Sequence, residues 1–247
     1  MALTTGTYLG SITSDTASLA ATITDETLDA DVPTCPGWTL RDLAHHLGEV
    51  QRWARLAAVT GAPPQDDAID PPPAPGPDEA RALQEWLTSG ARALVDAMRD
   101  LDPAAPTWHP FPVPRVAGVW PRRQAHEVAV HRWDAQRAVG EPGDAFPLAA
   151  DFVAEYFEVI VPRVIDRDGR TPPVGRLRVR LTDAGTEWAV DTTERDVRFT
   201  ASAAADVDLP ELTGSADDVV LALWRRQPLP GGPTSPLAEQ WLEFGGN

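Results

Sequence analysis

The sequence predicts an α+β protein, with a helical N-terminal part followed by a small α/β C-terminal part. Apolar residues first recur every three or four positions, as in amphipathic helices. From Arg176 onward they alternate with polar residues, as in half-buried strands. The composition, 43% hydrophobic and 23% charged, is that of a soluble globular protein, and 247 residues can bury a sizeable core. The change from helical to alternating spacing of apolar residues places the boundary between the two parts within residues 145–175.

Two helices are expected before the first Pro-rich stretch. The first covers residues 5–29, where leucine and isoleucine recur at near-helical spacing. After the turn that follows, Thr39 is a good N-cap, and Asp42 completes the pattern of a capping box. The second helix is expected to run to about Val59. Residues 61–78 are rich in proline and are therefore predicted to form an exposed loop.

Three further helices complete the predicted helical part. The third starts near Pro77, and a second Pro-rich connection, residues 101–121, follows it. Tryptophan and phenylalanine in this connection indicate that it packs over another surface. The fourth helix, residues 121–139, has proline in its first position and is stopped by a glycine. A fifth helix is expected at residues 148–165.

The C-terminal part is predicted to contain strands and one helix. Arg176–Thr182 alternates apolar and polar residues, and Thr186–Asp191 looks like its hairpin partner. Asp196–Ser202 and Ala205–Leu212 are further candidate strands. Ser215–Arg226 has the pattern of a helix that is capped by its first residue.

Charge and composition exclude several classes of partner. The net charge of −16 argues against binding nucleic acid, whose phosphates require a basic surface, and disfavours an anionic membrane. No apolar run reaches the roughly 18 residues that span a bilayer, and no signal peptide is visible, so a cytoplasmic location is expected. The one cysteine, Cys35, rules out an internal disulfide and a cysteine-rich metal site. All 21 basic residues are arginine, so lysine chemistry is absent.

Helical geometry separates the two adjacent histidines of the second helix. Because residues advance about 100° each, His46 lies beside the apolar stripe. His45 instead belongs to a polar row that is expected to face solvent, together with Asp42, Glu49 and Arg52. For His46 alone, two interpretations stay open: a core histidine satisfied by a hydrogen bond, or a ligand.

The fourth helix carries three polar groups on one narrow face. With Glu127 as the reference, His131 lies about 40° to one side and Asp134 about 20° to the other, while His126 points away. One interpretation is an ordinary Glu-to-His contact on a solvent-exposed helix surface, which would stabilise the helix by a few tenths of a kcal/mol. Against it, the helix has a separate polar set expected to face solvent: Arg132, Gln136 and Arg137.

Together, His46, Glu127 and His131 form a set of two histidines and one glutamate. Three protein ligands leave a position open for water or substrate, as catalytic zinc sites require. Helical bundles build such sites from facing helices. The spacing therefore fits a metal site between the second and fourth helices, and it fits equally a core histidine beside an ordinary Glu-to-His contact.

Three segments resemble one known family. Cys35–Ala54 (CPGWTLRDLAHHLGEVQRWA) and Trp120–Ala138 (WPRRQAHEVAVHRWDAQRA) are similar to the two signature segments of the mycothiol-dependent maleylpyruvate isomerase family. Gly214–Arg226 (GSADDVVLALWRR) resembles the end of its C-terminal domain. The resemblance implies a DinB-like four-helix bundle at residues 1–148 and a sterol-carrier-like α/β domain at residues 149–247.

The resemblance also implies a ligand set. A divalent metal, usually zinc, would be held by His46, Glu127 and His131; nickel, cobalt and iron(II) suit the same ligands. Asp134 would orient a ligand or an arginine. Either Arg225 or Arg226 would bind a substrate carboxylate, and the choice stays open because the glycine that usually precedes this arginine is missing. Both arginines could instead stabilise a helix C-terminus.

The chemistry implied by the resemblance is thiol-assisted. Mycothiol would supply a thiol that the metal deprotonates, and the thiolate would add to the double bond of an unsaturated dicarboxylate. Rotation about the new single bond, followed by elimination, would complete a cis–trans isomerisation. Two alternatives stay open: a mycothiol S-transferase acting on an electrophile, and a non-catalytic metal-binding or regulatory protein.

Overall fold

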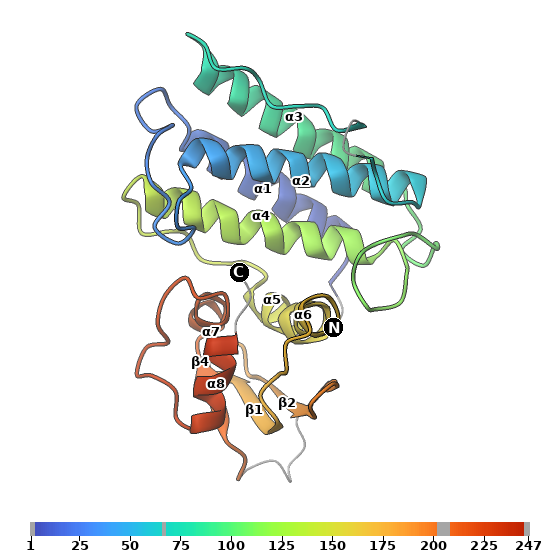
Figure 1. Cartoon of the computed structure of the whole chain (residues 1–247), viewed down its shortest axis with the longest axis vertical. Coiled ribbons are helices and arrows are strands. Elements are labelled where there is room, and N and C mark those ends of the chain that lie inside the picture. The colour runs from blue at the N-terminus through green and yellow to red at the C-terminus, as the bar shows by residue number, and fades with distance from the viewer. Residues whose placement is uncertain (1–2, 66–67, 202–207, 245–247) are drawn as a thin grey trace. The chain divides into compact units, whose positions relative to one another are not determined.

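The computed structural model describes residues 3–65, 68–201 and 208–244, and the α+β class predicted from the sequence is confirmed (Figure 1). Contacts divide the chain into two compact units. The helical unit comprises Met1–His109 and Pro114–Asp144, and the mixed unit comprises Pro110–Val113 and Ala145–Asn247. The domain limits 1–148 and 149–247 remain a prediction beside this division.

Four long helices form the helical unit. They are α1 (Thr5–Ala21), α2 (Leu40–Thr60), α3 (Glu79–Arg99) and α4 (Val119–Ala138). Helix α1 packs on α3 and α4, and α2 packs on the same two helices, so the four run alongside one another (Figure 1). The core contains fully buried leucines from α2 and α3: Leu43, Leu47, Leu83 and Leu87. No helix in the described part of the chain is both long and apolar enough to cross a bilayer.

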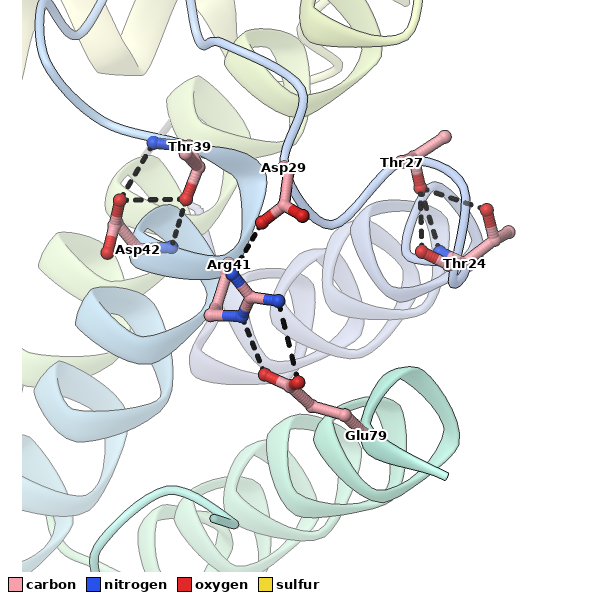
Figure 2. A network of polar contacts seen from close by, with 7 residues as sticks. All are labelled: Thr24, Thr27, Asp29, Thr39, Arg41, Asp42 and Glu79. Atoms are coloured by element: carbon pink, nitrogen blue, oxygen red, sulfur yellow. Dashed lines mark hydrogen bonds and ion pairs between the residues drawn. The ribbon is translucent and has the colours of Figure 1, made fainter. Parts of the chain in front are cut away.

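Helix α1 ends at Ala21, earlier than the sequence analysis predicted. The residues that follow form turns, because threonine hydroxyls bond to main-chain carbonyl groups there and compete with the helix. The Thr22 hydroxyl donates to the Leu19 carbonyl at 2.7 Å, and the Thr27 hydroxyl donates to the Thr22 carbonyl at 2.7 Å. Thr27 also lies against Thr24 (Figure 2).

The predicted capping box at the start of α2 is confirmed. The main-chain N–H of Asp42 donates to the Thr39 hydroxyl, and the Asp42 carboxylate accepts from the Thr39 N–H at 2.9 Å (Figure 2). Beside it, Arg41 bridges Asp29 at 2.5 Å and Glu79 at 2.6 Å. These contacts fix the first turn of α2, the helix that carries His46.

The prediction that Arg52 faces solvent is wrong. Its side chain is buried between α2 and α3. Its guanidinium lies 4.0 Å from the centre of the Trp86 ring and donates to the Trp86 carbonyl at 2.8 Å. Gly48 allows the Trp86 ring to pack this closely against α2, because a Cβ at position 48 would lie 2.0 Å from the ring. Glu49, in the same predicted row, is exposed as expected.

Helix α4 is buried on most sides, with 15 of its 20 residues buried. Arg132 and Gln136 are among them, so the prediction that they face solvent is wrong, and only Arg137 of that set is exposed. They are buried because each has polar partners: Arg132 pairs with Asp15 at 3.0 Å, and Gln136 accepts from Arg132 at 2.9 Å. The proline predicted at the first position is instead the third residue of α4; a missing N–H is tolerated throughout a first turn.

The mixed unit contains a four-stranded sheet in the order β3-β2-β1-β4. The strands are β1 (Gly175–Leu181), β2 (Thr186–Thr192), β3 (Val197–Ala201) and β4 (Glu211–Gly214). Neighbours β1, β2 and β3 pair antiparallel, whereas β4 runs parallel to β1. The first three strands match the predicted ones, while much of the fourth predicted strand lies outside the described residues.

Helices pack against this sheet. The predicted helix 148–165 is observed as α5 (Ala149–Glu155) and α6 (Val161–Asp168), joined by the π-helical segment η2 (Tyr156–Ile160). Helix α7 (Ala216–Leu223) starts after Ser215, whose hydroxyl accepts from the Asp218 N–H as predicted for a cap. Helix α8 (Pro236–Phe244) was not predicted from the sequence.

Candidate metal site

The structure brings His46, Glu127 and His131 together between α2 and α4. His46 Nε2 lies 3.5 Å from Glu127 Oε1, and His131 Nε2 lies 3.5 Å from the same oxygen. The two imidazole rings are nearly perpendicular, with centres 5.3 Å apart. His131 is buried, whereas His46 and Glu127 are partly exposed. One donor atom from each residue therefore faces a common point that solutes can approach.

The spacing of these donor atoms fits a divalent metal better than a hydrogen-bonded triad. Both nitrogen–oxygen distances of 3.5 Å exceed the normal hydrogen-bond range. Ligands bound tetrahedrally at 2.0–2.1 Å lie about 3.4 Å apart, close to the observed separation. Two imidazole nitrogens and one carboxylate oxygen suit zinc, and the set leaves a coordination position open.

The opposite atoms of two of these ligands are anchored. Arg123 Nη2 donates to Glu127 Oε2 at 3.0 Å, which leaves Oε1 directed at the two histidines. His131 Nδ1 lies 3.0 Å from Asp134 Oδ2, which holds this edge of the imidazole and leaves Nε2 as the nitrogen that could bind a metal once it loses its proton. A carboxylate bound to the far nitrogen of a ligating histidine is the usual support of a metal site.

Asp134 is itself held from the turn that precedes α2. Its carboxyl group is fully buried, and its Oδ1 accepts a hydrogen bond from the Thr34 hydroxyl at 2.6 Å. The Cys35 thiol donates weakly to Oδ2 at 3.7 Å. Asp134 thus contacts His131 through Nδ1, on the side of the ring opposite Nε2. It is not one of the three residues whose donor atoms face one another.

Burial and charge act in opposite directions on the pKa values of this cluster. Burial alone would raise the pKa of Glu127, but the nearby His131 and His46 imidazoles and the charge of Arg123 hold it well below its usual range. Burial would lower the pKa of His131, but Asp134 and Glu127 raise it to about 9. The metal-free cluster is therefore an ionised carboxylate beside a protonated imidazole.

The neighbouring histidines lie apart from this cluster. His45 packs its ring against Trp86, with ring centres 6.4 Å apart. His126 is 1% exposed and packs edge-on against Tyr8 at 6.2 Å. His46 and His45 thus point in different directions, as the helical geometry predicted, but His45 is half-buried against Trp86 and the prediction that it faces solvent is wrong.

Arg225 and Arg226 lie in the mixed unit, immediately after α7. Arg225 is exposed and has a φ of 59°, a left-handed conformation that only glycine adopts without strain. Arg226 is half-buried, and its guanidinium donates to the Trp224 carbonyl at 2.9 Å. Its main-chain N–H also donates to the Leu221 carbonyl and closes the end of the helix.

Sequence reasoning missed three residues around the cluster. Arg123 lies four residues before Glu127 on α4, so helical spacing contained the signal for it. Thr34 and Trp38 come from the turn before α2, and the Trp38 ring centre lies 5.0 Å from that of His46. Thr34 contacts Asp134, which lies 100 residues away on α4, whereas Trp38 contacts a residue only eight positions later. No helical spacing rule extends from this irregular turn to either partner, so both contacts required the tertiary structure.

Comparisons of the sequence and of the structure with known proteins lead to the same family. The family described as the mycothiol maleylpyruvate isomerase N-terminal domain matches residues 9–136. A crystal structure of a mycothiol-dependent maleylpyruvate isomerase superimposes with a TM-score of 0.60 at 15% identity, covering 96% of this chain and 94% of the other. A histidine-to-alanine mutant of such an isomerase gives 0.59 at 14% identity with the same coverage. At this identity the likeness shows a shared fold, and no curated protein matches the sequence.

Proposed function

The chain belongs to the mycothiol maleylpyruvate isomerase family, and on that premise we propose that it is a metal-dependent enzyme that uses mycothiol to isomerise an unsaturated dicarboxylate. The observation that carries the proposal is the convergence of His46 Nε2 and His131 Nε2 on Glu127 Oε1 at 3.5 Å each. A divalent metal held there would lower the pKa of a bound thiol, so that mycothiol reacts as a thiolate at neutral pH.

The chain's own residues have distinct parts in this proposal. His46, Glu127 and His131 would hold the metal, which would supply the positive charge that lowers the pKa of the thiol. Arg123 keeps Glu127 Oε1 directed at the site, and Asp134 keeps His131 in the tautomer that binds through Nε2. Mycothiol rather than Cys35 supplies the thiol in this proposal, because the Cys35 thiol lies 3.7 Å from the buried Asp134 carboxylate instead of facing Glu127 Oε1.

Product analysis tests the proposed reaction. Purified protein loaded with zinc is incubated with mycothiol and maleylpyruvate, and we expect the trans isomer to accumulate while mycothiol is not consumed. A persistent S-conjugate would identify a transferase instead. Absence of turnover with maleylpyruvate and with a panel of electrophiles would leave a metal-binding protein. His46→Ala should abolish turnover, whereas the matched variant His45→Ala should retain it.

We further propose that Arg226, rather than Arg225, binds a substrate carboxylate. The family usually has glycine before its active-site arginine, and Arg225 occupies a left-handed position that favours glycine. This conformation supports aligning Arg225 with that glycine and Arg226 with the active-site arginine that follows it. A guanidinium can bind a carboxylate through two parallel hydrogen bonds.

Substitution of the two arginines should separate their roles. Arg226→Ala is expected to raise the KM for the dicarboxylate by about 10- to 100-fold, the cost of losing a charged hydrogen bond. Arg225→Gly should leave the KM unchanged and stabilise the fold by about 1 kcal/mol, because it relieves the left-handed strain. Steady-state kinetics and thermal unfolding measure both effects. A KM increase confined to Arg225→Gly would contradict the assignment.

Metal affinity should depend on pH through His131. Its pKa of about 9 in the metal-free protein means that a metal must displace one proton at lower pH. Glu127 stays ionised, because its pKa lies well below its usual range. We therefore expect zinc affinity, measured by competition with a chelator, to rise about tenfold per pH unit from pH 7 to about 9 and then level off. A flat profile would contradict a protonated His131.

A further inference from the structure

The turn before α2, Pro33–Trp38, is held rigidly by its own main chain. The Val32 N–H donates to the Trp38 carbonyl at 2.9 Å, and the Cys35 N–H donates back to the Val32 carbonyl at 3.0 Å. The Trp38 N–H donates to the Cys35 carbonyl at 3.0 Å, and Gly37 supplies the left-handed φ of 85° that the turn requires. The side chains of this turn therefore have fixed starting points.

From this turn, Thr34 reaches the support of the metal ligands. Its hydroxyl donates to Asp134 Oδ1 at 2.6 Å, while Oδ2 of the same carboxylate faces His131 Nδ1 at 3.0 Å. Each oxygen of a fully buried carboxylate is thus held by a different element of the fold. A carboxylate held at both oxygens cannot rotate away from the imidazole without breaking a bond that burial makes expensive to lose.

We propose that Thr34 is a positioning residue of the metal site: its hydroxyl fixes the Asp134 carboxylate so that His131 Nε2 stays directed at Glu127 Oε1. This inference rests on the proposed function, because it takes the cluster to be a metal site. Thr34 touches neither the metal nor the substrate in this scheme. It acts through Asp134, about 100 residues away in the sequence, by the preorganisation that outer ligands provide.

A purely structural role is the alternative, in which Thr34 only ties the turn to α4. Thr34→Val, which keeps the shape and removes the hydroxyl, is expected to weaken zinc binding about tenfold. Thr34→Ser keeps the hydroxyl and should stay within about threefold of the unmodified protein. Thr88→Val is the matched control, because the Thr88 hydroxyl donates to the Gln84 carbonyl on α3, and it should not change zinc affinity.

A double-mutant cycle separates the two roles. If Thr34 acts through Asp134, Thr34→Val should change zinc affinity less than about twofold when Asp134→Ala is already present. The same tenfold loss in both backgrounds would overturn the proposal. Equal affinity of Thr34→Val and the unmodified protein would overturn it as well.

A measurement without metal keeps the inference separate from the proposed function. In metal-free protein labelled with ¹⁵N-histidine, we expect the His131 Nδ1 proton to exchange with water about tenfold faster in Thr34→Val than in Thr34→Ser or the unmodified protein. Unchanged exchange would overturn the inference. Failure of the unmodified protein to bind any divalent metal would overturn the proposed function alone, and the exchange rates would still decide the role of Thr34.

Discussion

Replacing Glu127 with glutamine should remove the metal from this protein and reduce thiol-dependent turnover to below about 1% of its normal rate. The substitution preserves shape but removes the one anionic donor of the cluster, to which both histidine nitrogens point at 3.5 Å. Losing a supporting group around a metal commonly costs 10- to 100-fold in affinity, and loss of a charged ligand should exceed that. Metal content after dialysis and turnover with mycothiol measure the two effects.

Glu49→Gln is the matched control for this experiment. It makes the same chemical change on the exposed side of α2, so metal content and turnover should stay normal. Thermal unfolding of the metal-free proteins shows whether both variants are folded. Stoichiometric metal retained by folded Glu127→Gln would remove Glu127 from the ligand set and with it the proposed site.

Replacing Arg132 with methionine should destabilise the fold by about 3–5 kcal/mol, the cost of breaking a buried ion pair from one side. Arg132 is 2% exposed and pairs with Asp15 at 3.0 Å across the contact between α4 and α1. Burial already raises the pKa of Asp15, and the hydrogen bond from Ser11 and the charge of Arg132 act against this rise. Without the guanidinium, the Asp15 carboxylate would be buried next to an apolar side chain.

The pH dependence of this loss has a definite sign. A carboxyl group whose folded pKa lies above its unfolded value opposes folding when it is ionised, and this penalty fades as pH falls through the folded pKa. Arg132→Met should therefore recover part of its stability in acid, and Asp15→Asn in the same background should recover it at neutral pH. Denaturant unfolding at several pH values measures this. Arg137→Met, an exposed neighbour on α4, should cost little; an equal loss there would contradict the explanation.

Several elements of this fold could be read from the sequence because they depend on neighbours along the chain. The capping box of Thr39 and Asp42 involves residues three apart, and the change from helical to alternating spacing separates the two parts of the fold. The face shared by Glu127, His131 and Asp134 follows from the pitch of one helix. Residues three or four apart on a helix must be neighbours whatever the rest of the fold does.

Other features depended on which elements face each other, and sequence patterns gave the wrong answer for some. Arg52 and Arg132 were expected in solvent because charged residues usually lie there. Each is buried instead, Arg52 against the Trp86 ring and Arg132 against Asp15, because a partner from another helix offsets the cost of desolvation. Neither partner can be identified from the helix on which the arginine lies.

The sequence by itself determined the fold class and the face that Glu127, His131 and Asp134 share on α4, and it predicted His46 rather than His45 as a ligand. Only the tertiary structure decided that His46 meets Glu127, that Thr34 holds Asp134, and that Arg225 occupies a left-handed position. The physical reason is the distance along the chain over which each interaction acts. Helical pitch and capping act over a few residues, whereas the donor atoms of this cluster are brought together by packing between helices that are far apart along the chain.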